Sequence, residues 1–409
     1  MKSRSNYNGV LHLFTTRFPY GLSEPFLENE IPFLASFFKE VRIYPLFKEA
    51  KVRELPKGVV VIDLFNDPYQ PAGYWQLLKN FGLFSGILKQ EKSRTKGAVK
   101  NEVWAELRSS LRQNLYRALV LKAQLKEHTQ DDVFYSYWTF DWATVLAMLV
   151  KMNVIPGFVS RVHGFDLYEE RSKKGFIPFR QLQLEESDKI VAVSKDGLKY
   201  LKKNYEQHSR KFYLSHLGVQ DHGIGPFPLS SIPHIVSCSN VIPLKRVGLI
   251  AQALKAWNKS VTWTHFGGGN GMDEILEVIN SMPQNIDVNL KGAVPNAEIL
   301  EFYRTQEVSL FLHLSSSEGG VSVAMQEAAS FGIPLMGAAV GGVPEICNEN
   351  TGVLLSPDPD VGEVTEALDG FFNNSKNNAE FRGQVKAYWA KQFKAETVFP
   401  LFCQLLVAR

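Results

Sequence analysis

The sequence has few cysteines, no strong excess of charge of one sign and no long apolar run. The cysteines of its 409 residues are Cys238, Cys347 and Cys403, so a disulfide-stabilised secreted fold and a cysteine-rich zinc site are excluded and a reducing cytoplasm is expected. Its 45 Lys and Arg nearly balance 42 Asp and Glu, which gives no support for nucleic-acid binding. A transmembrane helix needs about 20 apolar residues, and the most apolar segment, 142–159, is interrupted by a lysine, an asparagine and a proline.

The length predicts more than one domain. A single hydrophobic core stops growing at about 250–300 residues, and 45% hydrophobic with 21% charged residues is typical of a globular chain. The stretch 220–233 is rich in Gly, Pro and Ser and indicates a linker. We therefore expect domains at 1–220 and 221–380. The helical pattern of the tail, 381–409, fits either a cap on the second domain or a helix that packs back on the first.

Short apolar runs alternate with longer amphipathic segments in both halves. Predicted strands include Val10–Phe14 and Val133–Tyr137 in the first half and His234–Ser239 and Val308–His313 in the second. Helical segments such as Ser322–Phe331 lie between such runs. This alternation predicts an α/β fold with a parallel sheet in each half. Because parallel sheets bind ligands outside the carboxyl ends of their strands, two such domains facing across a cleft would hold two substrates.

The segment Leu310–Ser356 carries the strongest functional pattern. A strand runs into a serine-rich turn, then Glu318 and two glycines, and then a helix that carries Glu327. Glycines let the backbone approach a ligand closely, and the first amides of a helix favour an anion. The predicted phosphate contacts are Gly319, Gly320, Val321 and Ser322. Glu327 can accept hydrogen bonds from vicinal hydroxyls such as those of ribose, whereas the alternative is a plain strand–turn–helix with solvated glutamates.

The same segment resembles the donor-binding signature of the retaining glycosyltransferases of family 4 (group 1), which have the GT-B fold of two Rossmann-like domains. That signature holds two glutamates, a Gly-x-Pro strand start and a Gly-Gly-x-x-Glu turn. Residues 332–334 and 341–345 match the last two features. Glu318 and Glu327 are separated by eight residues, one more than in the signature, and the extra residue lies in the turn 319–321.

Further landmarks of the resemblance precede this segment. In the family, an Arg and a later Lys hold the diphosphate; Lys245 matches the Lys, whereas Asn240 stands at the Arg position. Arg246 is the neighbouring cation that would compensate. The glycine turn at Gly268 resembles the one that admits the nucleotide, and the loop with Val294 resembles the one whose backbone holds the base.

The first half holds candidates for the reaction centre and the acceptor. His163 lies in a His-Gly-Phe-Asp motif that resembles the histidine motif near the reaction centre of related enzymes, although a lone histidine can also be structural. Gly21 lies in a loop that resembles the family's first glycine-containing loop, close to the donor phosphate or the acceptor. The acceptor-site candidates are Glu24, Tyr137, Trp138 and Asp166.

The resemblance implies a retaining hexosyltransferase-type enzyme. It would move a sugar from a UDP- or GDP-linked donor to a hydroxyl of a glycan or lipid-linked glycan in polysaccharide or cell-surface biosynthesis. Lys245 would stabilise the leaving diphosphate, Glu318 would contact phosphate and sugar hydroxyls, and His163 would lie near the reacting carbon. No Asp-x-Asp motif stands at a strand end, so we expect no metal and no cofactor beyond the nucleotide-sugar. The alternatives are an epimerase or hydrolase on the same fold, and a non-catalytic nucleotide-sugar-binding subunit, which Asn240 and the extra turn residue favour.

The stretch 79–126 is basic and amphipathic. It contains eleven Lys or Arg and three acidic residues, and such a stretch can lie on anionic lipid. Its interleaved apolar residues are Phe81, Leu83, Phe84, Ile87, Leu88 and Trp104. We therefore expect a cytoplasmic protein with a candidate peripheral contact to the inner face of the membrane; a solvated helix face is the alternative.

Overall fold

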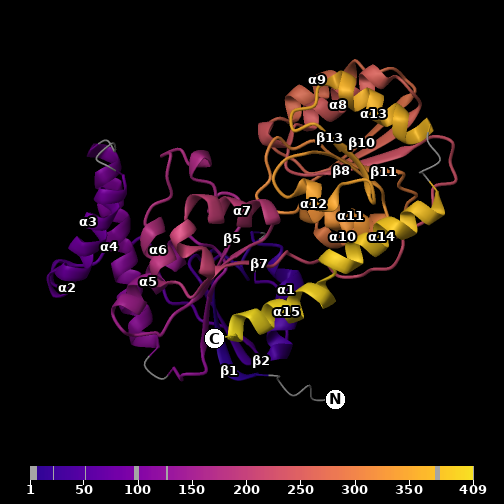
Figure 1. Cartoon of the computed structure of the whole chain (residues 1–409). Coiled ribbons are helices and arrows are strands. Elements are labelled where there is room, and N and C mark those ends of the chain that lie inside the picture. Colours follow the sequence, from indigo (N-terminus) through magenta and orange to yellow (C-terminus); the bar gives the residue numbers. More distant parts are fainter. Residues whose placement is uncertain are drawn as a thin grey trace. The chain divides into compact units, whose positions relative to one another are not determined.

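The computed structural model divides into two compact units (Figure 1). It describes residues 7–21, 23–50, 52–95, 101–125, 128–373 and 378–408. Unit 1 comprises Met1–Ser215 together with Phe399–Arg409, and unit 2 comprises His216–Val398. The division falls shortly before the predicted boundary at residue 220, and the tail is shared between the units at residue 399.

Unit 1 contains, within the described residues, a seven-stranded parallel sheet in the order β3-β2-β1-β4-β5-β6-β7. Its strands are β1 (Tyr7–Thr15), β2 (Phe38–Pro45), β3 (Val59–Val61), β4 (Val133–Ser136), β5 (Val159–Val162), β6 (Lys189–Ala192) and β7 (Phe212–Leu214). The chain starts in the middle of the sheet and winds outward in both directions, so the strand order reverses between β1 and β4. Ligands of open α/β sheets bind at such a switch point.

The helices of unit 1 cover both faces of this sheet. They are α1 (Leu27–Phe37), α2 (Tyr74–Lys79), α3 (Phe81–Arg94), α4 (Asn101–Gln124), α5 (Asp141–Lys151), α6 (Arg180–Glu186), α7 (Lys195–Asn204) and the short 3₁₀ helices η1 (Glu169–Arg171) and η2 (Glu206–Lys211). Alternate residues of a strand face opposite sides. Leu11 and Leu13 of β1 therefore join the core beneath α1, whereas Phe14 joins the core beneath α4 and α5.

Unit 2 repeats this architecture with a parallel sheet of six strands among the described residues, ordered β10-β9-β8-β11-β12-β13. The strands are β8 (His234–Cys238), β9 (Val261–Phe266), β10 (Ile286–Gly292), β11 (Leu310–His313), β12 (Leu335–Ala338) and β13 (Gly352–Leu355). The helices are η3 (Pro243–Lys245), α8 (Val247–Trp257), α9 (Met272–Asn280), α10 (Asn296–Thr305), α11 (Val323–Ser330), α12 (Val343–Ile346), α13 (Val361–Asn373) and α14 (Ala379–Phe393). The last helix, α15 (Ala395–Val407), begins in unit 2 and lies in unit 1 from Phe399 onward. The predicted α/β class with a parallel sheet in each half is confirmed.

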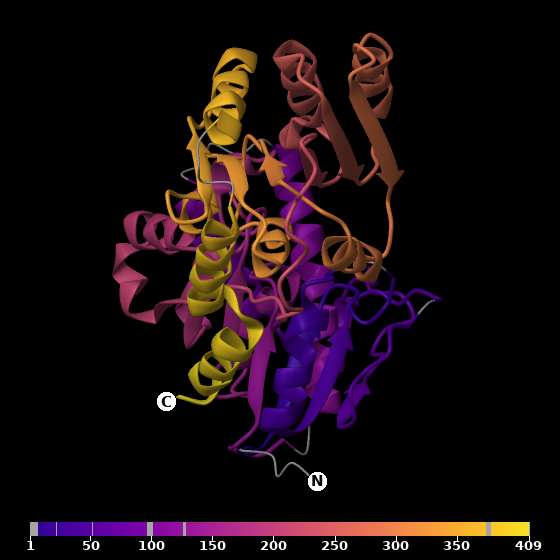
Figure 2. The same ribbon diagram turned by 90° about the vertical axis from the view of Figure 1, so that its right-hand side faces the viewer.

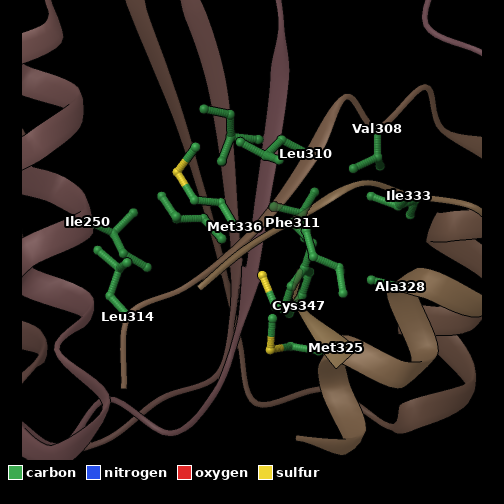
Figure 3. Close-up of a cluster of buried hydrophobic side chains, with 14 of the residues drawn as sticks. Ile250, Val308, Leu310, Phe311, Leu314, Met325, Ala328, Ile333, Met336 and Cys347 are labelled. Atoms are coloured by element: carbon green, nitrogen blue, oxygen red, sulfur yellow. The ribbon is translucent and has the colours of Figure 1, made fainter. Parts of the chain in front are cut away.

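The core of unit 2 lies on both faces of its sheet (Figure 3). Ile250 of α8 packs on one side, and Met325 and Ala328 of α11 pack on the other. Phe311 of the central strand β11 is fully buried between these layers. Truncating a buried Phe to Ala costs about 3–5 kcal/mol, so this core holds the strand ends that carry the site in place.

The C-terminal helices belong to different units (Figure 2). Trp389 and Phe393 of α14 are fully buried in the core of unit 2. Phe402 of α15 instead belongs to unit 1, where its ring lies 3.9 Å from the guanidinium carbon of Arg161. Arg161 forms an ion pair with Glu30, and both side chains are fully buried. The end of the chain therefore shields a buried charge pair of unit 1.

Candidate functional site

The turns that follow the strands of unit 2 meet at one edge of its sheet, because all these strands are parallel. Two backbone hydrogen bonds join the turns after β8 and β9: Ser239 N–H donates to Phe266 O at 2.9 Å, and Val241 N–H donates to Gly268 O at 2.9 Å. Asn240 is exposed in the first of these turns. After β10, Val294 is half-buried against the core. The predicted donor-site positions of these turns therefore belong to one edge.

Lys245 and Glu318 form an ion pair at this edge. Lys245 ends η3, and Glu318 lies in the turn after β11. His313 Nε2 lies 2.8 Å from the Glu318 Oε1 atom that also accepts from Lys245. Burial favours the neutral acid, but the hydrogen bonds and charges of His313 and Lys245 outweigh it and lower the pKa of Glu318 to about 2. The structure thus keeps a carboxylate charged and holds the ammonium of Lys245 beside the glycine turn.

Arg246 is committed to contacts within unit 2. Its Nε donates to Leu314 O at 2.6 Å, and its terminal nitrogens donate to the carbonyl oxygens of Ser315 and Pro357 and to the Asp358 carboxylate. These bonds tie the start of α8 to the turns after β11 and β13. The guanidinium therefore has a structural role that Lys245 does not share.

A second glycine turn supports the first. Gly341 has φ +51°, and a Cβ built there would lie 2.1 Å from the backbone oxygen of Glu318. A Cβ built on the neighbouring Gly342 would lie 2.5 Å from the backbone of Gly320. The turn 318–320 therefore packs directly against the backbone of Gly341 and Gly342. It leads through the buried Val321 to Ser322, the residue that precedes α11.

Glu327 lies on α11 and is 7% exposed. Asn296, the first residue of α10, donates from Nδ2 to Glu327 Oε1 at 2.8 Å. Burial raises the pKa of Glu327 to about 7, although the hydrogen bond from Asn296 opposes this effect. Burial also raises the pKa of the neighbouring Cys238 thiol to about 12, so Cys238 is not a nucleophile at neutral pH. Glu327 is therefore a buried acceptor at the same edge as Lys245.

In unit 1, Glu24 organises the loop after β1. Its Oε1 accepts from Thr16 N–H at 2.9 Å and from Trp138 Nε1 at 2.6 Å. Its Oε2 accepts from the amides of Arg17 and Phe18, both at 2.7 Å. Gly21, in the same loop, accepts a hydrogen bond from Arg53 Nε at 3.0 Å. Glu24 therefore shapes the loop with both carboxylate oxygens.

The ends of β4 and β5 place four predicted residues together. The His163 ring lies 4.1 Å from Trp138 and 4.8 Å from Tyr137, measured between centroids, and is tilted against both rings. Asp166 accepts from His163 N–H at 2.7 Å and from Thr139 N–H at 2.9 Å, so it joins the two strand ends. His163 is 7% exposed, and neither ring nitrogen has a hydrogen-bond partner among the described residues. The hydroxyl of Tyr137 likewise has no hydrogen-bond partner among the described residues, so both groups are polar sites that a ligand can satisfy.

Sequence reasoning missed three residues at these edges. His313 ends the predicted strand before Glu318, and Asn296 ends the predicted loop that carries Val294. Phe165 lies inside the histidine motif; it is 56% exposed, and its ring centroid is 4.9 Å from that of Trp138. Each residue lies within or beside a motif that the sequence identifies. Its hydrogen-bond or ring partner, however, lies on another element, so no local pattern predicts that interaction.

Two parallel α/β units with glycine-rich turns at the strand ends are the GT-B-like fold. Residues 232–388 match the family described as Glycosyl transferases group 1. Over these residues the chain matches the group 1 glycosyltransferases, and the family resemblance seen in the sequence is confirmed there. A curated relative, the putative colanic acid biosynthesis glycosyltransferase WcaL of Escherichia coli (strain K12), is 22% identical over 298 residues, which cover 69% of this chain and 73% of WcaL.

Solved structures have the same fold over the whole chain. Anabaena Alr3699/HepE in complex with UDP has a TM-score of 0.68 at 14% identity and covers 97% of this chain and 99% of its own. TarM has a TM-score of 0.70 at 12% identity, with complete coverage of both chains. Within the described residues, no helix is long and apolar enough to cross a membrane, and no cluster of three or more His, Cys, Asp or Glu is placed to hold a metal ion.

Proposed function

We propose that this chain transfers a sugar from a UDP-sugar to an acceptor hydroxyl with retention of configuration. The observation that carries the proposal is the meeting of Lys245, the turn 318–322 and the buried Glu327 at one sheet edge of unit 2. UDP is favoured over GDP because Alr3699/HepE, which shares the fold, binds UDP. Retention rests on the family.

Lys245 and the amides that lead into α11 would stabilise the leaving diphosphate. Negative charge develops on the leaving group in the transition state, and preorganised donors there contribute most to catalysis. An ammonium has three donors, so its ion pair with Glu318 leaves donors for phosphate oxygens. His313 keeps Glu318 ionised and thereby holds Lys245 in place. Because Lys245 supplies the positive charge, we propose that the reaction needs no metal.

Glu327 would bind the ribose. Its carboxylate is buried on α11 and receives one hydrogen bond from Asn296. Vicinal hydroxyls would donate to it and replace part of the solvation that burial removes. The glycine turns at Gly268 and near Val294 would admit the nucleotide to this edge.

Unit 1 would bind the acceptor along Trp138 and Phe165. Glu24 fixes the indole of Trp138 from one side, and Phe165 offers an exposed ring beside it. Aromatic faces of this kind suit the apolar face of a sugar ring. The imidazole of His163, whose nitrogens have no hydrogen-bond partner among the described residues, would contact the reacting hydroxyl or the transferred sugar.

We further propose that the product belongs to a polysaccharide or another cell-surface glycan and that the enzyme works in the cytoplasm. WcaL, the relative noted above, is a putative glycosyltransferase of colanic acid biosynthesis. Cys238, Cys347 and Cys403 are free thiols, which fits a reducing compartment.

Calorimetric titration of the full chain with UDP and with GDP tests the donor site. We expect UDP to bind, and we expect Lys245→Ala and Glu327→Ala each to weaken binding by at least about tenfold, the equivalent of about 1.4 kcal/mol. Lys255→Ala is the matched control because Lys255 is an exposed lysine of α8 in the same unit. Equal affinity in all four proteins would contradict the assignment.

Incubation with a panel of labelled UDP-sugars, with and without glycan-lipid acceptors, separates the reaction classes. Transfer to an acceptor supports the proposal. Free sugar alone indicates a hydrolase, an interconverted donor indicates an epimerase, and saturable binding without turnover indicates a nucleotide-sugar-binding subunit. The last outcome would fit the exposed Asn240 at the position of the family's Arg.

A further inference from the structure

An unusual group of exposed hydrophobic side chains lies around α2. Tyr74 is 72% exposed, Trp75 74% and Phe81 65%, and Tyr69 and Leu78 are also exposed. We call Tyr69, Tyr74, Trp75, Leu78 and Phe81 the aromatic patch. Single exposed hydrophobic residues are ordinary on protein surfaces, but several close together mark an interaction site.

The local structure holds the patch outward. Ala72 is buried and forms two hydrogen bonds with Arg112 of α4: its N–H donates to the Arg112 backbone oxygen at 3.0 Å, and its oxygen accepts from the Arg112 guanidinium at 3.1 Å. The side chain of Gln76 accepts from Gly73 N–H at 2.7 Å and fixes the start of the helix. Leu77 packs on the core. With Leu77 turned inward, Tyr74, Trp75 and Leu78 face solvent, at the outer edge of unit 1 (Figure 1).

The structure corrects which apolar residues of the basic stretch are available. Leu83, Phe84, Leu88 and Trp104 pack against the core of unit 1. Ile87 is buried outright. Of the six apolar residues named in the sequence, only Phe81 is exposed and belongs to the patch. Lys96, Lys100 and Lys126 of that stretch lie outside the described residues.

Charge near the patch is positive. Lys79, Lys89 and Lys92 are exposed on α2 and α3. Glu91 of the same segment is buried and paired with Arg94 at 2.8 Å, so it does not offset these lysines at the surface. Asp67 is the exposed acid of residues 66–95; on α4, Glu102 and Glu106 are exposed, and so are the cations Arg108 and Lys122. The surface around the patch therefore complements an anionic partner.

We propose that the aromatic patch inserts into the interfacial region of a bilayer that contains anionic lipid. Trp and Tyr favour this region because their rings are apolar and their N–H and O–H groups remain hydrogen-bonded to water or headgroups. Apolar insertion and lysine attraction add together in peripheral binding. The lysines of α2 and α3 contact the headgroups. This inference goes beyond the glycosyl transfer proposed above and does not depend on it.

Vesicle flotation of the full chain tests the proposal. We expect binding to phosphatidylcholine vesicles that contain about one third phosphatidylglycerol, and weaker binding at high salt or without the anionic lipid. The double substitution Tyr74→Ser with Trp75→Ser should lower the partition constant of the protein on vesicles by at least about tenfold, because membrane binding scales with the buried apolar area. Trp75→Phe alone should retain binding within about twofold.

Leu229→Ser is the matched control, because Leu229 is an 83% exposed hydrophobic residue of unit 2, outside the patch. It should bind vesicles as the unchanged chain does. The proposal is overturned if the unchanged chain does not float, if the double variant floats equally well, or if binding ignores both salt and lipid charge. UDP affinity measured on the same samples should be equal in all variants, which separates this test from that of the donor site.

Discussion

Replacing Glu327 by Gln should make unit 2 more stable while it weakens nucleotide binding. Burial raises the pKa of Glu327 from 4.5 to about 7. The charged carboxylate is therefore less favourable in the folded protein than in the unfolded chain. Each pKa unit corresponds to about 1.36 kcal/mol, so the difference between 4.5 and about 7 amounts to about 3 kcal/mol. This cost is absent below pH 4.5, grows as the pH rises and is complete above pH 7. The glutamine side chain of the Glu327→Gln variant is uncharged and therefore has no such cost.

Urea unfolding at pH 5 and pH 8 measures the effect. Hydrogen exchange of peptides from β11 and α11 reports on unit 2 alone. The free energy of unfolding of the unchanged protein should fall between the two pH values, and Glu327→Gln should remove that fall and gain about 2–3 kcal/mol at pH 8. Glu298→Gln is the control, since Glu298 is exposed on α10.

A different outcome would refute the reasoning. If Glu327 only anchors Asn296, its substitution should lower stability at both pH values and leave UDP affinity nearly unchanged. Our reasoning instead requires a gain in stability at pH 8 together with at least about tenfold weaker UDP binding, since a charged acceptor of two hydroxyls is lost. The opposite signs of the two effects distinguish a functional carboxylate from a structural one.

Three further predictions concern single residues. Lys245→Ala should lower kcat/KM for transfer by well over about tenfold with folding retained, whereas Lys255→Ala should not, as initial rates will show. Glu24→Ala leaves four donors unpaired, of which the Phe18 amide is buried and the others are part-buried, and it should cost about 2–4 kcal/mol in urea unfolding of unit 1. Glu28→Ala, at an exposed residue, should change the free energy of unfolding by at most about 0.5 kcal/mol. Phe165→Ala should raise the KM for a glycan acceptor with unchanged UDP affinity, and an unchanged KM would remove Phe165 from the acceptor site.

Local patterns predicted much of the fold. The predicted strand His234–Ser239 and the predicted helix Ser322–Phe331 agree with β8, His234–Cys238, and α11, Val323–Ser330, to within one residue at each end. Apolar periodicity marks such elements because each buries one face or is wholly buried. The short edge strand β7 and the small helix α12 were missed. Their few residues carry too little periodicity to distinguish them from turns.

Side-chain roles were harder to predict because partners lie far apart in the chain. Arg246 is predicted to lie beside the diphosphate, and in the structure it also donates to carbonyl groups of residues 314, 315 and 357, which no local pattern indicated. Glu24 and Asp166 were expected at the acceptor, and both accept backbone amides that shape the loops around Trp138 and His163. A motif identifies a chemical group but not the donors that surround it.

The order of apolar and polar residues by itself determined the two parallel sheets and the edge at which the ligands of unit 2 are expected, because strand periodicity and glycine turns are local properties. Only the tertiary structure decided that Glu318 meets His313 and Lys245, that Glu327 is buried, and that Trp75 faces solvent while Leu83 does not. These outcomes depend on which distant elements pack together, and burial and charge pairing arise only from that packing.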